Sequence, residues 1–288
     1  MMKPSQIELK KERDFSDVFN AAFSFIGSEA GRLFRVIALY AGVPVIIAVI
    51  MSAYYARDTM TSIFHVMSGA NDMSQPDTGL VLLTILFGVV AQLFLMGLVP
   101  AYMAEYEQKG KDGFRADDVW QRFARNFGGI AGFGILSMVI IIVGFVLFLI
   151  PGIYLSVPLS FILYVLLIEN KKGGALFSRC FQLVRSQWWK TFGILLLAYL
   201  ILAIVSGIFS LPSAIVAGIE GFLVGSGEKE VMEANSLAVI LTTIFGGLGQ
   251  YILYPGLYVV VAFQYYNLRE QKDRESLMEK VSEIKEDE

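Results

Sequence analysis

The stretch that decides the fold runs from Asn126 to Ile168 and reads NFGGIAGFGILSMVIIIVGFVLFLIPGIYLSVPLSFILYVLLI. It contains no charged residue. A helix crosses the hydrocarbon core of a bilayer with about 20 apolar residues, so this run is too long for a single crossing. Because proline cannot continue a helical hydrogen-bond ladder and glycine permits a turn, Pro151-Gly152 divides the run. The sequence therefore predicts two membrane spans joined by a tight turn.

The whole chain has the composition of a membrane protein. Of its 288 residues, 56% are hydrophobic and 17% are charged, whereas soluble domains carry about 25% charged residues. The charges crowd into short segments between long uncharged runs, which predicts an all-α integral membrane protein with six transmembrane helices. The predicted spans are Leu33–Tyr55, Gly79–Met103, Gly128–Ile150, Gly152–Ile168, Thr191–Ile219 and Leu237–Tyr266.

The positive charges support six crossings and set the orientation. With six spans, all 23 Lys and Arg residues except Arg57 and Lys229 fall on one side. The positive-inside rule makes that side cytoplasmic, with both termini there. Without a turn at Pro151-Gly152 only five spans would remain, and this asymmetry would be lost. Three parts are predicted: a cytoplasmic N-terminal segment (1–32), the membrane domain (33–268) and a charged cytoplasmic tail (269–288).

An amphipathic stretch precedes each odd-numbered span, at residues 15–26, 117–127 and 175–189. In each, apolar residues recur at spacings of three and four, which places them on one helical face. Aromatic residues on that face, with arginines on or beside it, are typical of a helix lying in the membrane interface. The predicted lipid-interface residues are Trp120, Arg122, Arg125, Arg179, Arg185, Trp188 and Trp189.

The even-numbered spans share a proline, at Pro100, Pro158 and Pro255. Asn170 and Asn267 each follow the proline of their span by 12 residues. This pattern predicts three parallel repeats, each made of an interfacial helix, a span and a return span. The alternative is that prolines are simply common in membrane helices.

The run from Leu149 to Leu197, LIPGIYLSVPLSFILYVLLIENKKGGALFSRCFQLVRSQWWKTFGILLL, resembles a group of bacterial six-span membrane proteins of uncharacterised function. The group includes the membrane domain of some glycerophosphodiester phosphodiesterases and the YciC-like proteins. The resemblance rests on the Pro-Gly-Ile-Tyr turn, Glu169, and the basic amphipathic helix that leads to Trp188-Trp189. It implies a location in the bacterial inner (cytoplasmic) membrane, and the motifs that carry it are structural rather than catalytic.

No catalytic motif is present in the sequence. It has one histidine, His65, one cysteine, Cys180, and neither a phosphate-binding loop nor an HExxH motif. The glycine-rich segment from Ile244 to Gly256 lies inside a span, where small residues favour close helix packing. The net charge of −3 argues against a nucleic-acid partner. No catalytic residue, metal or cofactor is therefore expected.

Four polar residues are candidates for an intramembrane site, because such residues are costly in lipid. Gln92 and Gln250 lie in the middle of spans two and six, where they either bind a polar solute or ion or form an ordinary interhelical hydrogen bond. Glu105 and Glu169 lie near the cytoplasmic ends of spans. They either carry protons in a transporter, or reach headgroup water or pair with nearby lysines and arginines.

Three functions fit these observations. The first is a non-enzymatic membrane protein that organises or senses the cytoplasmic leaflet or docks a partner, with membrane lipids, a protein or a second copy of the chain as partners. The second is a transporter or channel for an ion or small solute, and the third is a lipid-modifying enzyme. The aromatic and basic amphipathic stretches, together with the absence of a catalytic motif, favour the first.

The predicted topology is testable with reporters. A tag inserted at Pro151-Gly152 is expected on the outer side of the membrane, while tags at both chain ends are expected in the cytoplasm. Accessibility of each tag to an impermeant reagent in intact cells measures this. A cytoplasmic tag at Pro151-Gly152, or chain ends on opposite sides, would contradict six crossings.

Overall fold

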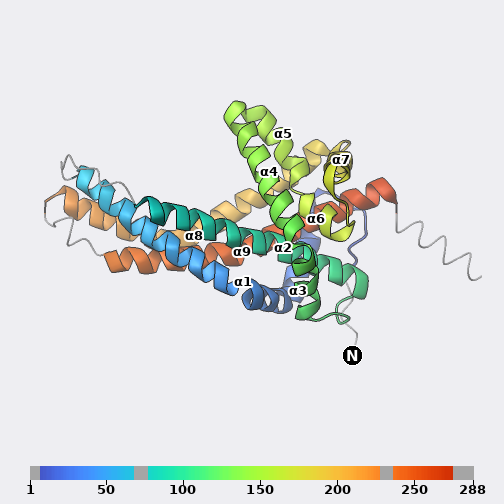
Figure 1. Cartoon of the computed structure of the whole chain (residues 1–288), viewed down its shortest axis with the longest axis horizontal. Coiled ribbons are helices and arrows are strands. Elements are labelled where there is room, and N and C mark those ends of the chain that lie inside the picture. The colour runs from blue at the N-terminus through green and yellow to red at the C-terminus, as the bar shows by residue number, and fades with distance from the viewer. Residues whose placement is uncertain (1–6, 68–76, 228–235, 275–288) are drawn as a thin grey trace, which may run out of the picture. The chain divides into compact units, whose positions relative to one another are not determined.

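The computed structural model describes residues 7–67, 77–227 and 236–274, and these form helices without any strand (Figure 1). Six helical segments among them are long and apolar enough to cross a membrane, which confirms the predicted all-helical, six-span class. The helices are α1 (Phe15–Met67), α2 (Thr78–Lys109), α3 (Ala116–Arg125), α4 (Phe127–Leu147), α5 (Leu149–Leu159), α6 (Ile162–Ile168), α7 (Gly173–Val184), α8 (Trp188–Gly225) and α9 (Ser236–Asp273).

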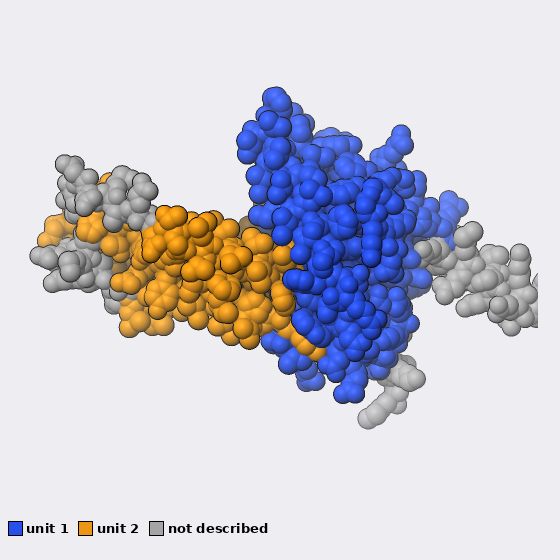
Figure 2. All heavy atoms as spheres, in the orientation of Figure 1, with its two compact units in different colours: residues 1–39, 95–199, 255–288 blue, residues 40–94, 200–254 orange. Residues whose placement is uncertain are grey.

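The chain divides into two compact units (Figure 2). Unit 1 comprises residues 1–39, 95–199 and 255–288, and unit 2 comprises residues 40–94 and 200–254. Unit 1 contains the short helices α3 to α7 and one end of each of the four long helices. The predicted tail is described only as far as Arg274, and Lys229 also lies outside the described residues.

Unit 2 packs through small residues, as the glycine-rich segment of α9 predicts. A Cβ atom on Gly249 would lie 2.3 Å from the ring of Phe209 on α8, and one on Gly247 would lie 3.2 Å from a methyl group of Val49 on α1. The backbone of α9 therefore comes so close to α8 and α1 that a side chain larger than hydrogen does not fit at these glycines. Close approach at small residues is how helices pack against one another in lipid. Many of the apolar side chains of this unit are exposed, as expected for a surface in contact with acyl chains.

The hairpin of α4 and α5 in unit 1 confirms the fold of the long uncharged run but moves its turn. The chain turns at Phe148, which has an extended backbone (φ −157°, ψ 136°), three residues before the predicted position. Pro151 instead lies in the first turn of α5, where a helix leaves its N–H groups without intrahelical partners, so that proline fits there. Gly152 lets the two helices approach, because its Cα lies only 3.0 Å from where a Cβ of Gly144 would be.

The fourth span consists of two helices, α5 and α6, separated at Ser160 and Phe161. Pro158 has no N–H group and cannot bond the carbonyl of Tyr154, one turn earlier. The indole Nε1 of Trp188 donates to that carbonyl oxygen at 3.3 Å, and the Trp188 ring stacks on Tyr154 at a centroid distance of 5.7 Å. The start of α8 thus supplies the hydrogen bond that Pro158 removes from the span.

The first predicted interfacial helix is not a separate element, since residues 15–26 form the beginning of α1. Its buried face continues without a break through Val18, Ala22, Phe25, Glu29 and Leu33, all at most 2% exposed. This continuous face keeps the helix intact across Gly27 and Gly31, each of which costs about 1 kcal/mol relative to alanine. The other two stretches do form separate helices, α3 and α7, although Trp188 and Trp189 belong to α8.

Close contact in the hairpin predicts the effect of enlarging its glycines. A Cβ on Gly152 would lie 2.6 Å from the Phe145 ring and 2.8 Å from its backbone nitrogen, whereas one on Gly132 of α4 would meet nothing within 4 Å. Gly152→Val is expected to destabilise the protein by about 1–3 kcal/mol through overpacking, and Gly132→Val by much less. Unfolding of both variants in detergent measures this, and equal effects would contradict the hairpin geometry.

Candidate functional site

Charged side chains gather in unit 1 around the ends of α2, α6 and α9. Four of the buried or nearly buried glutamates there, with side-chain exposures of 0–11%, each contact a lysine or arginine. We call these four residues and their partners the ionic cluster. Its carboxylates are Glu29, Glu105, Glu107 and Glu169.

Glu105 near the end of α2 binds Arg122 of α3. The Arg122 Nε lies 2.6 Å from the Glu105 Oε1, and Lys109, one turn along α2, lies 3.0 Å from the other oxygen. The remaining nitrogens of Arg122 donate to the backbone oxygen of Leu167 at 3.1 Å and to Gln108 at 2.7 Å. One guanidinium therefore joins α2, α3 and α6, using the fork of donors that lysine lacks.

Glu169, directly after α6, binds Arg179 of α7. The Arg179 Nε lies 2.9 and 3.1 Å from the two oxygens of Glu169, and its terminal nitrogens bind Asp273 at the end of α9. Lys171 at 2.9 Å and the hydroxyl of Tyr265 at 3.0 Å complete the surroundings of Glu169. This arginine ties α7 to the ends of α6 and α9.

Glu107 connects α2 directly to α9. One of its oxygens lies 3.1 Å from Arg269, and the other accepts a hydrogen bond from the Tyr266 hydroxyl at 3.0 Å. Lys10, near the N-terminus, lies 3.7 Å from the same carboxylate. The long helices of unit 1 are thus joined by charge as well as by apolar contact.

Glu29 is the most deeply buried carboxylate of the ionic cluster. It lies on the buried face of α1, where the hydroxyl of Tyr102 donates to it at 2.7 Å. The ammonium of Lys111, from the segment between α2 and α3, lies 2.8 Å from its other oxygen. A buried carboxylate requires such partners. Without them, the hydration free energy lost on burial far exceeds the free energy gained from packing.

Neutral hydrogen bonds connect the N-terminal segment to α9. The backbone N–H of Arg13 donates to the Asn267 side chain at 2.8 Å, and the amide of Asn267 donates in turn to Gln264 at 3.1 Å. The Gln264 amide then donates to the hydroxyl of Thr191 on α8 at 2.9 Å. Gln264 and Asn267 have no exposed surface, so this chain of hydrogen bonds satisfies groups that water cannot reach.

The surroundings of α7 also shift two pKa values. Burial disfavours the charge of Arg179, but the hydrogen bond to Asp273 and the charge of Glu169 outweigh it and raise the pKa of the guanidinium. Burial raises the pKa of the Cys180 thiol to about 12. Cys180 has no exposed surface and packs as a small apolar side chain, in agreement with the absence of a second cysteine in the sequence.

The chemistry of this arrangement is charge compensation between helices. Each carboxylate of the ionic cluster has a cation within 3.1 Å, and several have a tyrosine or a backbone donor in addition. Glu105 and Glu169 pair with arginines, as one of the two sequence interpretations predicts. Across the described ranges, no group of three or more His, Cys, Asp or Glu side chains is placed to hold a metal ion.

The predicted polar and interfacial residues separate into different environments. Gln92 and Gln250 both lie in unit 2, where Gln250 is exposed and donates to the hydroxyl of Tyr254, one turn along its own helix. Arg122 and Arg179 point into the ionic cluster, whereas Arg125 and Arg185 are exposed.

The predicted interfacial tryptophans also differ. Trp188 is partly covered by Tyr154 and by Phe192, whose ring stacks on it at 5.3 Å, while Trp189 is 77% exposed. Trp120 is half-buried beside Phe123, at a centroid distance of 5.4 Å.

Several residues of the ionic cluster were not anticipated from the sequence. Glu29 is the only acidic residue between Asp17 and Asp58, and its position on the apolar face of a predicted helix is a signal that could have identified it. Arg269 and Asp273 belong to a segment that reads as an ordinary charged tail. Only the folded chain brings them to Glu107 and Arg179.

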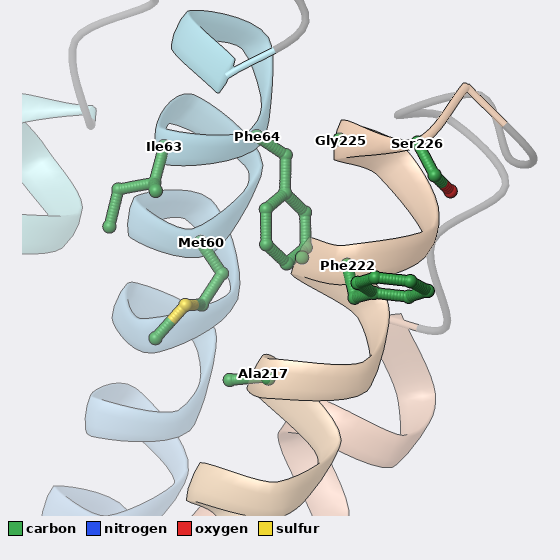
Figure 3. Close-up of a pocket in the computed structure, with 9 residues that line it drawn as sticks. Met60, Ile63, Phe64, Ala217, Phe222, Gly225 and Ser226 are labelled. Atoms are coloured by element: carbon green, nitrogen blue, oxygen red, sulfur yellow. The ribbon is translucent and has the colours of Figure 1, made fainter.

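Unit 2 contains an apolar cavity of about 710 Å³ (Figure 3). Met60 and Phe64 of α1 line it together with Ala217 and Phe222 of α8, and no ionisable side chain is among the lining residues. Such a lining suits an acyl chain or a neighbouring helix rather than a reaction.

No protein-family model, curated protein or solved structure matches this chain.

Removing one member of a buried pair tests the ionic cluster. Arg179→Gln is expected to destabilise the protein by about 3 kcal/mol, because Glu169 and Asp273 then lose their shared partner. The matched control is Arg185→Gln, which removes the same charge from an exposed position and is expected to change stability by at most about 0.5 kcal/mol.

Thermal unfolding in detergent compares the two variants, and the double variant Arg179→Gln/Glu169→Gln measures the coupling. Recovery of part of the lost stability in the double variant is expected, since it removes one of the two carboxylates that have lost Arg179. Equal stability of the two single variants would contradict a structural role for Arg179.

Proposed function

We propose that this chain is a non-enzymatic integral membrane protein of the bacterial inner membrane that organises or senses the cytoplasmic leaflet through α3, α7 and the start of α8. The observation that carries the proposal is the division of the arginines on these elements. Arg122 and Arg179 are neutralised by carboxylates inside unit 1, whereas Arg125 and Arg185 remain exposed. The inner arginines hold the helices, and the outer ones meet lipid headgroups.

Exposed apolar side chains accompany the outer arginines. Phe127, the first residue of α4, is 42% exposed, and Trp189, at the start of α8, is 77% exposed. Tryptophan beside arginine is typical of the headgroup level of a membrane, where an apolar ring and a cation are both accommodated. The two surfaces together favour an anionic leaflet as the partner.

The proposal includes three parallel repeats, each beginning with an interfacial helix, and the burial pattern supports it. Counted from the first residue of α1, α3 and α7, the fourth residue is Val18, Val119 or Leu176, and none has exposed surface. The eighth residue is Ala22, Phe123 or Cys180, with at most 1% exposed.

The charged partners of α3 and α7 follow the same register. The seventh residue of each helix is an arginine, Arg122 or Arg179, and each binds a glutamate at the end of the preceding span. α1 has Ala21 at this position, so only two of the three proposed units keep the arginine.

The location in the bacterial inner membrane, with both termini cytoplasmic, follows from the charge asymmetry and from the resemblance of residues 149–197 described above. The transport alternative relied on Gln92 and Gln250. Because Gln250 is exposed and bonds within its own helix, this pair does not favour a polar path. The carboxylates that a lipid-modifying enzyme would use are engaged in ion pairs.

Fluorescence quenching by brominated lipids tests the proposal. All three tryptophans of the chain, Trp120, Trp188 and Trp189, lie in the proposed interfacial region, so that the intrinsic fluorescence reports on it alone. In liposomes, brominated phosphatidylglycerol is expected to quench more than brominated phosphatidylcholine at equal mole fraction, because each cation near an anionic surface gains about 1 kcal/mol.

Arg125→Glu/Arg185→Glu is expected to abolish this preference. The control is Arg57→Glu, which reverses an exposed charge that the topology places on the outer side. Equal quenching by the two lipids in the unmodified protein, or a preference that persists in Arg125→Glu/Arg185→Glu, would refute an anionic leaflet as the partner.

A further inference from the structure

A second cavity, of about 310 Å³, lies in unit 1 between α1 and the beginning of α3. Its lining includes three arginines, Arg32 and Arg35 of α1 and Arg115 directly before α3, and a single acidic residue, Asp117. Positive charge therefore exceeds negative charge around this cavity. We call it the arginine pocket.

The three arginines differ in their partners. Arg32 binds the carboxylate of Asp112 at 2.6 Å and the backbone oxygen of Lys111, which fixes its guanidinium at the rim. Arg35 and Arg115 form no ion pair with any residue that the structure describes, and both are exposed. Among the described residues, these two guanidinium groups thus line the pocket without a direct ion pair, whereas each buried carboxylate of the ionic cluster has its cation.

The wall of the arginine pocket is rigid. Tyr102 is 1% exposed, and its hydroxyl is held by Glu29. The ring of Phe114 meets the Tyr102 ring edge-on at 5.0 Å. An aromatic pair held in this way gives the cavity a defined wall, which lowers the entropy lost when a ligand binds.

The sequence places this pocket at the boundary of the membrane. Arg35 is the last charged residue before residues 36–56, which carry no charge and are long enough to cross the hydrocarbon core. Leu39, one turn further along α1, is 61% exposed. An exposed apolar side chain therefore lies one helical turn from a guanidinium group of the pocket.

We propose that the arginine pocket binds a phosphate group, and that the phosphate is the headgroup of an anionic lipid. The planar guanidinium binds phosphate oxygens through paired N–H donors, which makes arginine the preferred residue for this contact. The inference deepens the proposed function and rests on its placement of α3 at the cytoplasmic leaflet. It assigns one discrete site in addition to the diffuse attraction of the outer arginines.

Binding of short-chain lipids to the full-length protein in a non-ionic detergent tests the proposal. The ligands are dioctanoyl phosphatidic acid, dioctanoyl phosphatidylcholine and glycerol 3-phosphate, titrated by calorimetry. Saturable binding of phosphatidic acid near one equivalent is expected, with phosphatidylcholine binding at least tenfold more weakly. Arg35→Gln/Arg115→Gln is expected to weaken the binding of phosphatidic acid at least tenfold.

The matched control is Arg57→Gln/Arg274→Gln, which removes the same charge from exposed positions outside the pocket and is expected to change affinity less than twofold. A second variant, Ala116→Leu, fills part of the pocket without changing charge and is expected to weaken binding as well. Size-exclusion chromatography and circular dichroism establish that each variant is folded. If the arginine double variant does not fold, Ala116→Leu carries the test.

The outcomes separate the sources of phosphate and the two proposals. Glycerol 3-phosphate binding as tightly as phosphatidic acid would support the phosphate site and overturn its assignment to a lipid. Equal affinity of the pocket variant and the control, or no saturable binding, would overturn the site itself. Quenching by brominated phosphatidylglycerol depends on Arg125 and Arg185 instead, so a failed pocket leaves the proposed function intact. If quenching fails while phosphatidic acid still binds, the proposed function is refuted and the phosphate site remains.

Discussion

The structure of unit 1 depends on one constraint, which is that a charge removed from water must be matched by a partner inside the protein. Four of the buried or nearly buried glutamates of this unit each lie within 3.1 Å of a lysine or arginine. The partners come from other parts of the chain, so every match is also a connection between helices. Arg122 joins three helices and Arg179 joins two helix ends to α7, which explains how short, separate helices keep defined positions.

The same constraint distinguishes the arginines that lie outside the ionic cluster. An arginine that forms no ion pair within the described residues remains available to anions from outside. Arg125 and Arg185 are of this kind on the exposed sides of α3 and beyond α7, and Arg35 and Arg115 are of this kind around a cavity. Paired and unpaired arginines therefore lie within a few residues of one another, and burial distinguishes them where residue type does not.

Hydrogen bonding imposes a parallel constraint on the backbone, because lipid offers no donor to replace one that a proline removes. Pro158 leaves the carbonyl of Tyr154 without its helical partner, and the indole of Trp188 donates to it. The aromatic stacking of Trp188 on Tyr154 and Phe192 places the indole for this bond. Trp188, which the sequence predicts to contact lipid, thus supplies a hydrogen bond to the backbone of the fourth span.

The sequence by itself determined the class of fold and the number of membrane spans. Hydrophobic length and the scarcity of charge are properties of each segment alone, so that residues 126–168 read correctly as a hairpin before any contact was known. The pairing of Glu105 and Glu169 with basic residues was also foreseen, since charges near span ends seek partners. The predicted position of the turn is wrong by three residues, because proline occurs both in loops and in the first turn of a helix.

Tertiary structure alone decided which arginines face inward, that residues 15–26 continue into α1, and that Glu29 and Glu107 belong to the ionic cluster. Glu107 and Arg269 are separated by 162 residues, and no local sequence pattern indicates that they are in contact. The physical reason is that hydrophobicity acts segment by segment, whereas an ion pair or a cavity exists only when distant parts of the chain come within a few ångströms.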